Sequence, residues 1–187
     1  DGKFYCHMDL GVLGRHNTMN ALAVAATSWV MKIPGEAVSK GVEAFHGAGR
    51  RMEFKGTYHG AQVYDDYAHH PDELRATLEA IRSMGDHRLV LAFQPHTYTR
   101  TKLLMDDFIR ELKKADVVVL AEIYAARESN TIGISSADLA AQIPGSIYCE
   151  TLQDVTETLR KIVKEGDIVV TMGAGDIFRA GEALLAE

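Results

Sequence analysis

Short apolar runs alternate with amphipathic segments along the second half of the chain, and this alternation constrains the fold more than any other feature. Three of these runs have the pattern of strands that are apolar on both faces, namely residues 88–93, 116–122 and 167–172. Such strands, separated by helices of roughly 10–13 residues, indicate parallel pairing through right-handed crossovers. The pattern therefore predicts an α/β chain with a doubly wound, mostly parallel sheet that helices cover on both sides.

The remaining elements follow from helical spacing, turn residues and period-two alternation. Residues 51–65 alternate apolar and polar side chains and carry Gly56 and Gly60 near a turn, which predicts a hairpin that pairs antiparallel at one edge of the sheet. Pro71 followed by two acidic residues is a strong helix start. Helices are expected over 71–81, 102–114, 135–143, 152–163 and from about 176 to 186, with a short strand over 146–149.

The first 46 residues stand outside this alternation. An Ala-rich helix is expected over 17–31 and a second helix over 34–45, which together are too little for a core of their own. The Gly-rich stretch 46–49 favours a hinge there, so we divide the chain into 1–46 and 47–187. The chain starts at Asp1 without an initiator Met, which suggests a piece of a longer protein.

Composition excludes several classes of partner. With 187 residues, 25% charged residues and a net charge of −6, the chain lacks the basic surface of a nucleic-acid or anionic-membrane binder. No apolar run approaches the ~18 residues of a membrane span. The two cysteines show no metal spacing, which favours a cytosolic protein with ordinary thiols. A nucleotide ligand stays possible, because it needs only a few local cations.

Two polar clusters lie in the first third of the chain, one at the start of the Ala-rich helix and one at the expected hinge. Asn17 and Asn20 share one face of a helix and could bind a purine edge or a sugar, although Asn17 could instead be a helix cap. Arg50 and Arg51 follow Gly49, where paired guanidinium donors suit a phosphate or a carboxylate. Surface arginines without such a role are an equally good interpretation.

Two further clusters each follow a strand and precede a helix. The segment 64–71 holds Asp65, Asp66, His69 and His70, and 93–101 holds His96, Tyr98 and Arg100. Ligands of open α/β sheets bind at such strand ends, and we expect neighbouring parallel strands to bring both loops over one crevice. A metal site from Asp66, His69 and His70 is possible, but hydrogen bonding is favoured. The turn 173–176 reads better as a tight turn than as a phosphate loop.

Taken together, these motifs resemble the Mur ligases of peptidoglycan synthesis, over essentially the whole chain and in the same order. The similarity is strongest to the members that add L-alanine to UDP-N-acetylmuramate, because Phe-Gln-Pro-His followed by Tyr and Arg-Thr is characteristic of them. The motifs that carry the resemblance are Gly14-Arg-His-Asn-Thr-Met-Asn20, Gly49-Arg-Arg51, Asp65-Asp-Tyr-Ala-His-His-Pro71, Phe93-Gln-Pro-His-Thr-Tyr-Thr-Arg-Thr101 and Gly173-Ala-Gly-Asp-Ile177.

The resemblance implies an ATP-dependent, Mg²⁺-assisted ligase of the bacterial cytoplasm, which forms an acyl phosphate on the substrate carboxylate before the amine attacks. It makes residues 1–46 the end of a central ATP-binding domain, and residues 47–187 a Rossmann-like C-terminal domain that binds the amino acid. No Gly-x-x-Gly-Lys-Thr phosphate loop occurs in this sequence. The N-terminal UDP-binding domain and most of the central domain would lie upstream, and we expect the chain alone to be inactive.

The resemblance also assigns residues one by one. It places His16, Asn17 and Asn20 at adenine-contacting positions, and Arg51 and Asp66 at positions that reach ATP. It places Tyr67, His69, His96 and Arg100 around L-alanine and the muramoyl carboxylate. It gives this chain no catalytic residue and no metal ligand. Thr97 stands where some members have a second arginine, and Tyr124 and Glu128 lie in a further loop without an assigned role.

Of three alternative functions, the first stays open and particular residues argue against the other two. The chain could be a stand-alone module that binds a nucleotide or an amino acid without catalysis. A ligase that recycles murein tripeptide shares the Asp-x-Ala-His-His-Pro element, but His96, Tyr98 and Arg100 argue against it. A nicotinamide-dependent oxidoreductase would need a Gly-rich first turn and an acidic residue about 20 positions on, and no segment supplies both.

Overall fold

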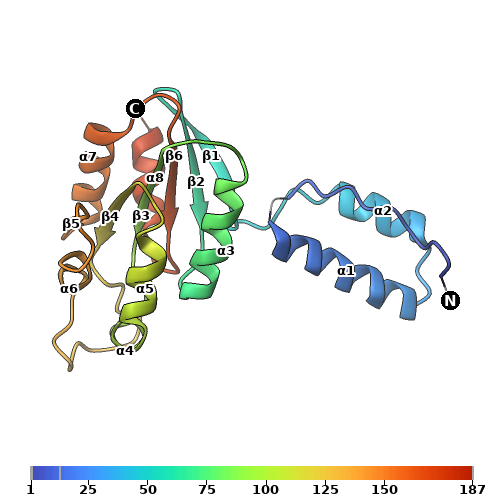
Figure 1. Cartoon of the computed structure of the whole chain (residues 1–187), viewed down its shortest axis with the longest axis horizontal. Helices are drawn as coiled ribbons and strands as arrows, with labels where there is room; N and C mark the ends of the chain where they lie inside the picture. The colour runs from blue at the N-terminus through green and yellow to red at the C-terminus, as the bar shows by residue number, and fades with distance from the viewer. Residues whose placement is uncertain (1, 13, 187) are drawn as a thin grey trace. The chain divides into compact units, whose positions relative to one another are not determined.

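The computed structural model describes residues 2–12 and 14–186. It divides into two compact units, Asp1–Gly49 and Arg50–Glu187 (Figure 1). The larger unit contains a six-stranded sheet with the strand order β1-β2-β6-β3-β4-β5. The strands are β1 (Glu53–Tyr58), β2 (Ala61–Asp66), β3 (Leu89–Phe93), β4 (Val117–Ala121), β5 (Ile147–Cys149) and β6 (Ile168–Met172).

The pairing of the strands confirms the predicted fold class. β1 pairs antiparallel with β2, and all other neighbouring strands pair parallel. The hairpin turns at His59 and Gly60, whereas Gly56 lies within β1, where the register shifts. One expectation is wrong: β2 and β3 are not neighbours, because β6 pairs with both of them and separates them. Sequence pattern identifies buried strands but does not specify which of them pair.

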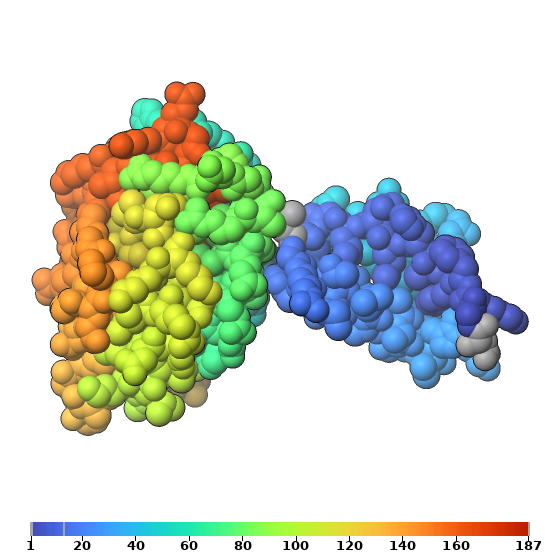
Figure 2. All heavy atoms as spheres, viewed as in Figure 1, coloured from blue at the N-terminus to red at the C-terminus, as the bar shows by residue number. Residues whose placement is uncertain are grey.

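Helices cover both faces of this sheet, as predicted (Figure 1). They are α3 (Pro71–Arg82), α4 (Tyr98–Leu103), α5 (Met105–Leu112), α6 (Ser136–Ala140), α7 (Leu152–Ile162) and α8 (Phe178–Leu185). Leu74, Phe108 and Leu139 from α3, α5 and α6 pack with Leu91 and Val170 in one core cluster. The other cluster includes α7 and α8 with the opposite side chains of the same strands. In Figure 2, the atoms of the region from α3 to α5, green to yellow, form much of the visible surface of the larger unit.

Two helices differ from the prediction for local reasons. The expected helix 102–114 is two helices that meet at Leu104, where the backbone leaves helical geometry at φ −109° and ψ 22°. Asp106 and Asp107 in the first turn of α5 favour a new helix start there, because carboxylates stabilise helix N-termini. The expected helix 135–143 ends at Ala140, shortly before Pro144, which disfavours helical backbone in the residue before it.

The smaller unit consists of α1 (Arg15–Val30) and α2 (Gly35–Glu43), which pack against each other, and the segment before them. Of its described residues, Ala21, Ser28 and Val38 are buried. Larger apolar side chains on and around α1 are exposed, among them Met19, Leu22, Trp29, Val30 and Met31. The helices of this unit therefore bury little apolar surface within it.

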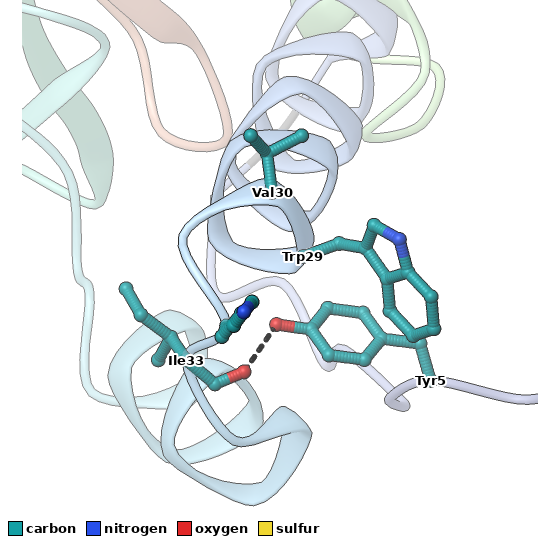
Figure 3. Close-up of a pocket in the computed structure, with 5 residues that line it drawn as sticks. Tyr5, Trp29, Val30 and Ile33 are labelled. Carbon is teal, nitrogen blue, oxygen red and sulfur yellow. Dashed lines mark hydrogen bonds between the residues drawn. The ribbon is translucent and has the colours of Figure 1, made fainter.

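A shallow pocket of about 490 Å³ lies at the end of α1, lined by Tyr5, Trp29, Val30, Lys32 and Ile33 (Figure 3). The rings of Tyr5 and Trp29 meet edge to face with centroids 5.1 Å apart. The Tyr5 hydroxyl donates to the carbonyl of Ile33 over 2.7 Å. None of these residues was predicted as a ligand contact. No helix in the described part of the chain is both long and apolar enough to cross a membrane.

Candidate functional site

The side chains predicted to surround the amino acid come together at the carboxyl ends of β2 and β3. The loop after β2 carries Tyr67 and His69, and the loop after β3 carries His96 and leads into Arg100 of α4. The ring centroids of His69 and His96 are 5.7 Å apart. The Arg100 Nη1 atom lies 3.2 Å from His96 Nδ1. The two loops therefore meet as predicted, although their strands are not neighbours.

The turn after β6 packs closely against Gln94, the first residue after β3. A Cβ atom on Gly173 would lie 2.6 Å from the Gln94 carbonyl oxygen, and one on Gly175 would lie 2.3 Å from Gln94 Oε1. Gln94 Oε1 accepts hydrogen bonds from the amides of Asp176 and Ile177, at 3.0 and 3.1 Å. This turn is therefore tight and filled by Gln94, which agrees with its interpretation as a strand-to-helix turn rather than a phosphate loop.

His96 is partly buried. Its ring stacks on Tyr124, with centroids 5.7 Å apart and an interplanar angle of 15°. Burial lowers the pKa of His96, the neighbouring Arg100 and His69 side chains lower it further, and the Glu128 carboxylate opposes this effect. Because a guanidinium only donates, His96 Nδ1 accepts from Arg100, and a neutral ring then carries its proton on Nε2. His96 can thus donate a hydrogen bond to an anionic ligand.

Glu73, the third residue of α3, holds the backbone of His69. The Glu73 carboxylate accepts from the amides of His69 and His70, at 3.0 and 3.2 Å. The His69 ring lies closer to another acceptor, because its Nδ1 is 3.1 Å from the Tyr67 carbonyl oxygen and 3.4 Å from Glu73 Oε2. Burial raises the pKa of Glu73, but these amides together with His69 and Arg51 outweigh it, so the pKa lies below its usual range. His70 caps α3, because its ring accepts from the Asp72 amide.

The two adjacent arginines have different environments. The Arg50 side chain is 25% exposed and donates to Asp65 Oδ2 at 2.8 Å, and to the carbonyls of Gly173 at 2.7 Å and Gly175 at 3.1 Å. The Arg51 side chain is 51% exposed, with Glu73 Oε1 at 3.7 Å and its guanidinium 5.7 Å from the Tyr67 ring. Arg51, the arginine predicted to reach ATP, is therefore the more accessible of the two.

Asp66, the carboxylate predicted to reach ATP, is only 3% exposed. Its Oδ2 accepts from the Met52 amide and its Oδ1 from the Ala68 amide, both at 2.8 Å. Burial raises the pKa of Asp66, and these amides together with nearby Arg51 partly offset the effect. Asp66 thus fixes the backbone immediately after Arg51 and immediately after Tyr67. Its contact with a nucleotide stays a prediction.

The three residues predicted to contact adenine belong to the smaller unit. The helix α1 starts at Arg15 with Gly14 as its N-cap, so Asn17 lies inside the first turn and does not cap the helix. His16 and Asn20 are exposed, and Asn17 is half-buried. Their contact with adenine also stays a prediction.

Several residues that shape the site had no predicted role, namely Glu73, Gln94, Tyr124 and Glu128. A carboxylate three residues after a helix cap was the available signal for Glu73. For Tyr124 and Glu128 the signal was their place just after β4, a third strand end. Within the described residues, no group of three or more His, Cys, Asp or Glu side chains is placed to hold a metal ion.

Comparison with known proteins agrees with this geometry. The family model "Mur ligase, glutamate ligase domain" matches residues 50–175. The UDP-N-acetylmuramate–L-alanine ligase of Lachnospira eligens is 48% identical over 180 residues, which cover 94% of this chain and 39% of that protein. The crystal structure of the UDP-N-acetylmuramate–alanine ligase of Thermotoga maritima superimposes with a TM-score of 0.82 at 28% identity, over 98% of this chain and 40% of that one.

A murein peptide ligase from Psychrobacter arcticus is also similar, with a TM-score of 0.66 and 25% identity over 95% of this chain and 38% of that one. The chain spans about two fifths of the length of the curated relatives it matches. Because the family model covers most of the chain, the sequence and the structure lead to one conclusion: this chain belongs to the Mur ligase family.

Proposed function

We propose that this chain is the C-terminal part of an ATP-dependent ligase that joins L-alanine to UDP-N-acetylmuramate in peptidoglycan synthesis. In this reaction ATP phosphorylates the muramoyl carboxylate, and the amine of L-alanine then attacks the acyl carbon with release of phosphate. ATP as co-substrate puts the reaction in the bacterial cytoplasm. The observation that carries the proposal is the strand-end group of His69, His96 and Arg100, at 5.7 Å and 3.2 Å.

The chemistry of this group suits an anionic guest. Arg100 and the Nε2–H of His96 offer donors to a carboxylate, and charge-assisted hydrogen bonds of this kind are the strong ones. Tyr67 and His69 line the same strand ends, with ring centroids 5.5 Å apart. These four side chains would hold the carboxylate of L-alanine, or the acyl group that it attacks.

We assign contacts with ATP to residues of each unit, taken separately. Arg51, half-exposed beside Tyr67, suits a phosphate, and Asp66 would act by fixing the backbone around Arg51. His16, Asn17 and Asn20 would contact adenine from α1. Among the described residues, no group of three or more His, Cys, Asp or Glu side chains is placed to hold a metal ion. Following the family resemblance, we assign the Mg²⁺ ligands and the UDP-sugar site to the rest of the parent protein.

The alternative is a ligase that recycles murein tripeptide. The alanine ligases are favoured because curated relatives with that name are 38–48% identical to this chain, whereas the murein peptide ligase structure is 25% identical. The loop with His96 and Arg100 supports the same choice.

A chimera tests the proposal, in which the upstream part of the Lachnospira eligens ligase is joined to this chain. Phosphate release is measured with ATP, UDP-N-acetylmuramate and either an amino acid or a peptide. We expect release with L-alanine and none with murein tripeptide. Arg100→Gln should raise the KM for L-alanine about tenfold or more, because it removes a charged donor. Arg110→Gln on α5, where the side chain is exposed, is the matched control and should leave the KM unchanged.

Two results would overturn the proposal. Release with tripeptide and not with L-alanine would favour the recycling ligase. An unchanged KM in Arg100→Gln would remove Arg100 from the site. The chain alone should release no phosphate above background under the same conditions, since it lacks the phosphate loop.

A further inference from the structure

The backbone between His96 and α4 has an unfavourable conformation. Thr97 has φ 65° and ψ 154°, a region that is essentially restricted to glycine, and Thr is β-branched. Such a conformation persists only where the surrounding contacts impose it, and it occurs preferentially at functional sites. Thr97 separates two predicted ligand contacts, because His96 precedes it and Arg100 lies one helical turn after it.

Three backbone contacts restrain Thr97 directly. Its amide donates to the Tyr124 carbonyl at 3.3 Å, and its carbonyl accepts from the amide and the hydroxyl of Thr101 at 3.1 and 2.7 Å. Thr101 is fully buried, so this contact is fixed to the core. The loop after β4 therefore holds one side of Thr97, and α4 holds the other.

Glu128 adds the contact that ties these two segments together. Its carboxylate accepts from the Thr99 amide at 2.9 Å and from the Thr99 hydroxyl. These bonds hold the pKa of Glu128 below its usual range, with smaller contributions from the Thr97 hydroxyl and the Tyr98 amide. Glu128 thus binds the first residues of α4, immediately after the unfavourable conformation at Thr97.

We propose that Glu128 is a positioning residue for the amino-acid site: it holds the start of α4 so that Thr97 keeps its left-handed backbone, and this orients His96 and Arg100 together. The inference rests on the proposed function, in which these two side chains bind the incoming amino acid. If Thr97 were released, its backbone would relax toward the extended region. Arg100 would then lose its contacts with His96, at 3.2 Å to Nδ1 and 3.3 Å to the carbonyl oxygen.

The imidazole of His96 reports this orientation directly. Arg100 on α4, His69 on the loop after β2, and Glu128 and Tyr124 on the loop after β4 face its ring. Burial, Arg100 and His69 lower its pKa, and Glu128 raises it. Loss of the Glu128 charge alone would therefore lower the pKa of His96 further. Release of the loop would raise it, because His96 would become exposed and separate from Arg100.

Imidazole resonances of the 187-residue chain, followed by NMR from pH 5 to 8, separate these two effects. The absence of one resonance in His96→Gln identifies His96 among the eight histidines. We expect Glu128→Ala to raise the pKa of His96 toward its ordinary value. Glu128→Gln, which keeps an acceptor without the charge, should lower it or leave it unchanged. Thr99→Ala, which removes only the hydroxyl donor, should raise it by less than Glu128→Ala.

An unchanged or lowered pKa of His96 in Glu128→Ala would overturn the proposal. A second readout is L-alanine titrated into the same samples, where Glu128→Ala should weaken binding about tenfold and Glu128→Gln only slightly. If the unaltered chain bound no L-alanine, the assignment of the amino-acid site would fail. The imidazole titration would still decide whether Glu128 positions the loop.

Discussion

Replacing Arg50 tests whether its buried ion pair with Asp65 stabilises the site, and replacing its neighbour Arg51 gives the comparison. The Asp65 side chain is 1% exposed, and Arg50 Nε donates to it at 2.8 Å. Arg50→Ala would leave this carboxylate buried without its cation, and would also remove the donors to the carbonyls of Gly173 and Gly175. Breaking a buried ion pair by removing one partner costs about 3–5 kcal/mol. We expect a loss of that size in the free energy of unfolding.

Thermal and urea unfolding followed by circular dichroism measure this loss. For a unit the size of Arg50–Glu187, about 3–4 °C of Tm corresponds to each kcal/mol, so Tm should fall by roughly 10 °C or more. Arg51→Ala is the matched control. The Arg51 side chain is half-exposed and 3.7 Å from its partner Glu73, and exposed ion pairs contribute less than about 1 kcal/mol.

The double variant Arg50→Ala/Asp65→Asn separates the ion pair from general packing. It should be less destabilised than the sum of its single variants, because both partners of the pair are then neutral. Two results would show that Arg50 is not the internal cation of this site. One is a loss of unfolding free energy in Arg50→Ala no larger than that in Arg51→Ala. The other is a double variant whose loss equals the sum of the losses in Arg50→Ala and Asp65→Asn.

Three further substitutions test other parts of the site, and a fourth, Gly41→Ala in α2, is the control for Gly175→Ala. Glu73→Gln should make the free energy of unfolding depend less on pH in the acid range. The pKa of Glu73 is lowered in the folded state, so its carboxylate stabilises the fold above the ordinary carboxyl pKa. This stabilisation is lost as the pH falls through the lowered pKa. Gly175→Ala should cost about 1–3 kcal/mol in urea unfolding, because its Cβ would lie 2.3 Å from Gln94 Oε1. Gly41→Ala, whose Cβ meets open space in α2, should instead be neutral or stabilising by up to about 1 kcal/mol. Thr97→Gly should raise stability by up to about 2 kcal/mol through relief of its backbone conformation, less the entropy that glycine adds to the unfolded chain.

The sequence was sufficient for the class of fold and for most of its elements. Buried parallel strands appear as continuous apolar runs, and the predicted run 167–172 corresponds to β6 (Ile168–Met172). The position of β6 at the centre of the sheet was not predictable, because an apolar run contains no information about its partners. The break at Leu104 between α4 and α5 was not predicted either, because the helical spacing of apolar residues continues across it.

The sequence pattern predicts the ligand contacts more readily than it predicts the residues that orient them. His69, His96 and Arg100 have chemistry of their own and follow strands, so type and position together identified them. Glu73 and Glu128 act through the backbone amides of other residues. Carboxylates are common on any surface, and only the distances in the folded chain distinguish these two.

The place of β6 gives the turn after it a role that its motif does not reveal. Neighbouring strands lie about 4.8 Å apart, so β2 and β3 are separated by roughly 9.6 Å across β6. The imidazoles of His69 and His96 are nevertheless only 5.7 Å apart. Glycine at positions 173 and 175 lets the turn after β6 approach Gln94 and Tyr124 closely, because a Cβ atom at either position would lie within 2.6 Å of one of these two residues. Tyr124 in turn stacks on His96, so the two glycines support the packing behind this imidazole although they read as a tight turn and not as a phosphate loop.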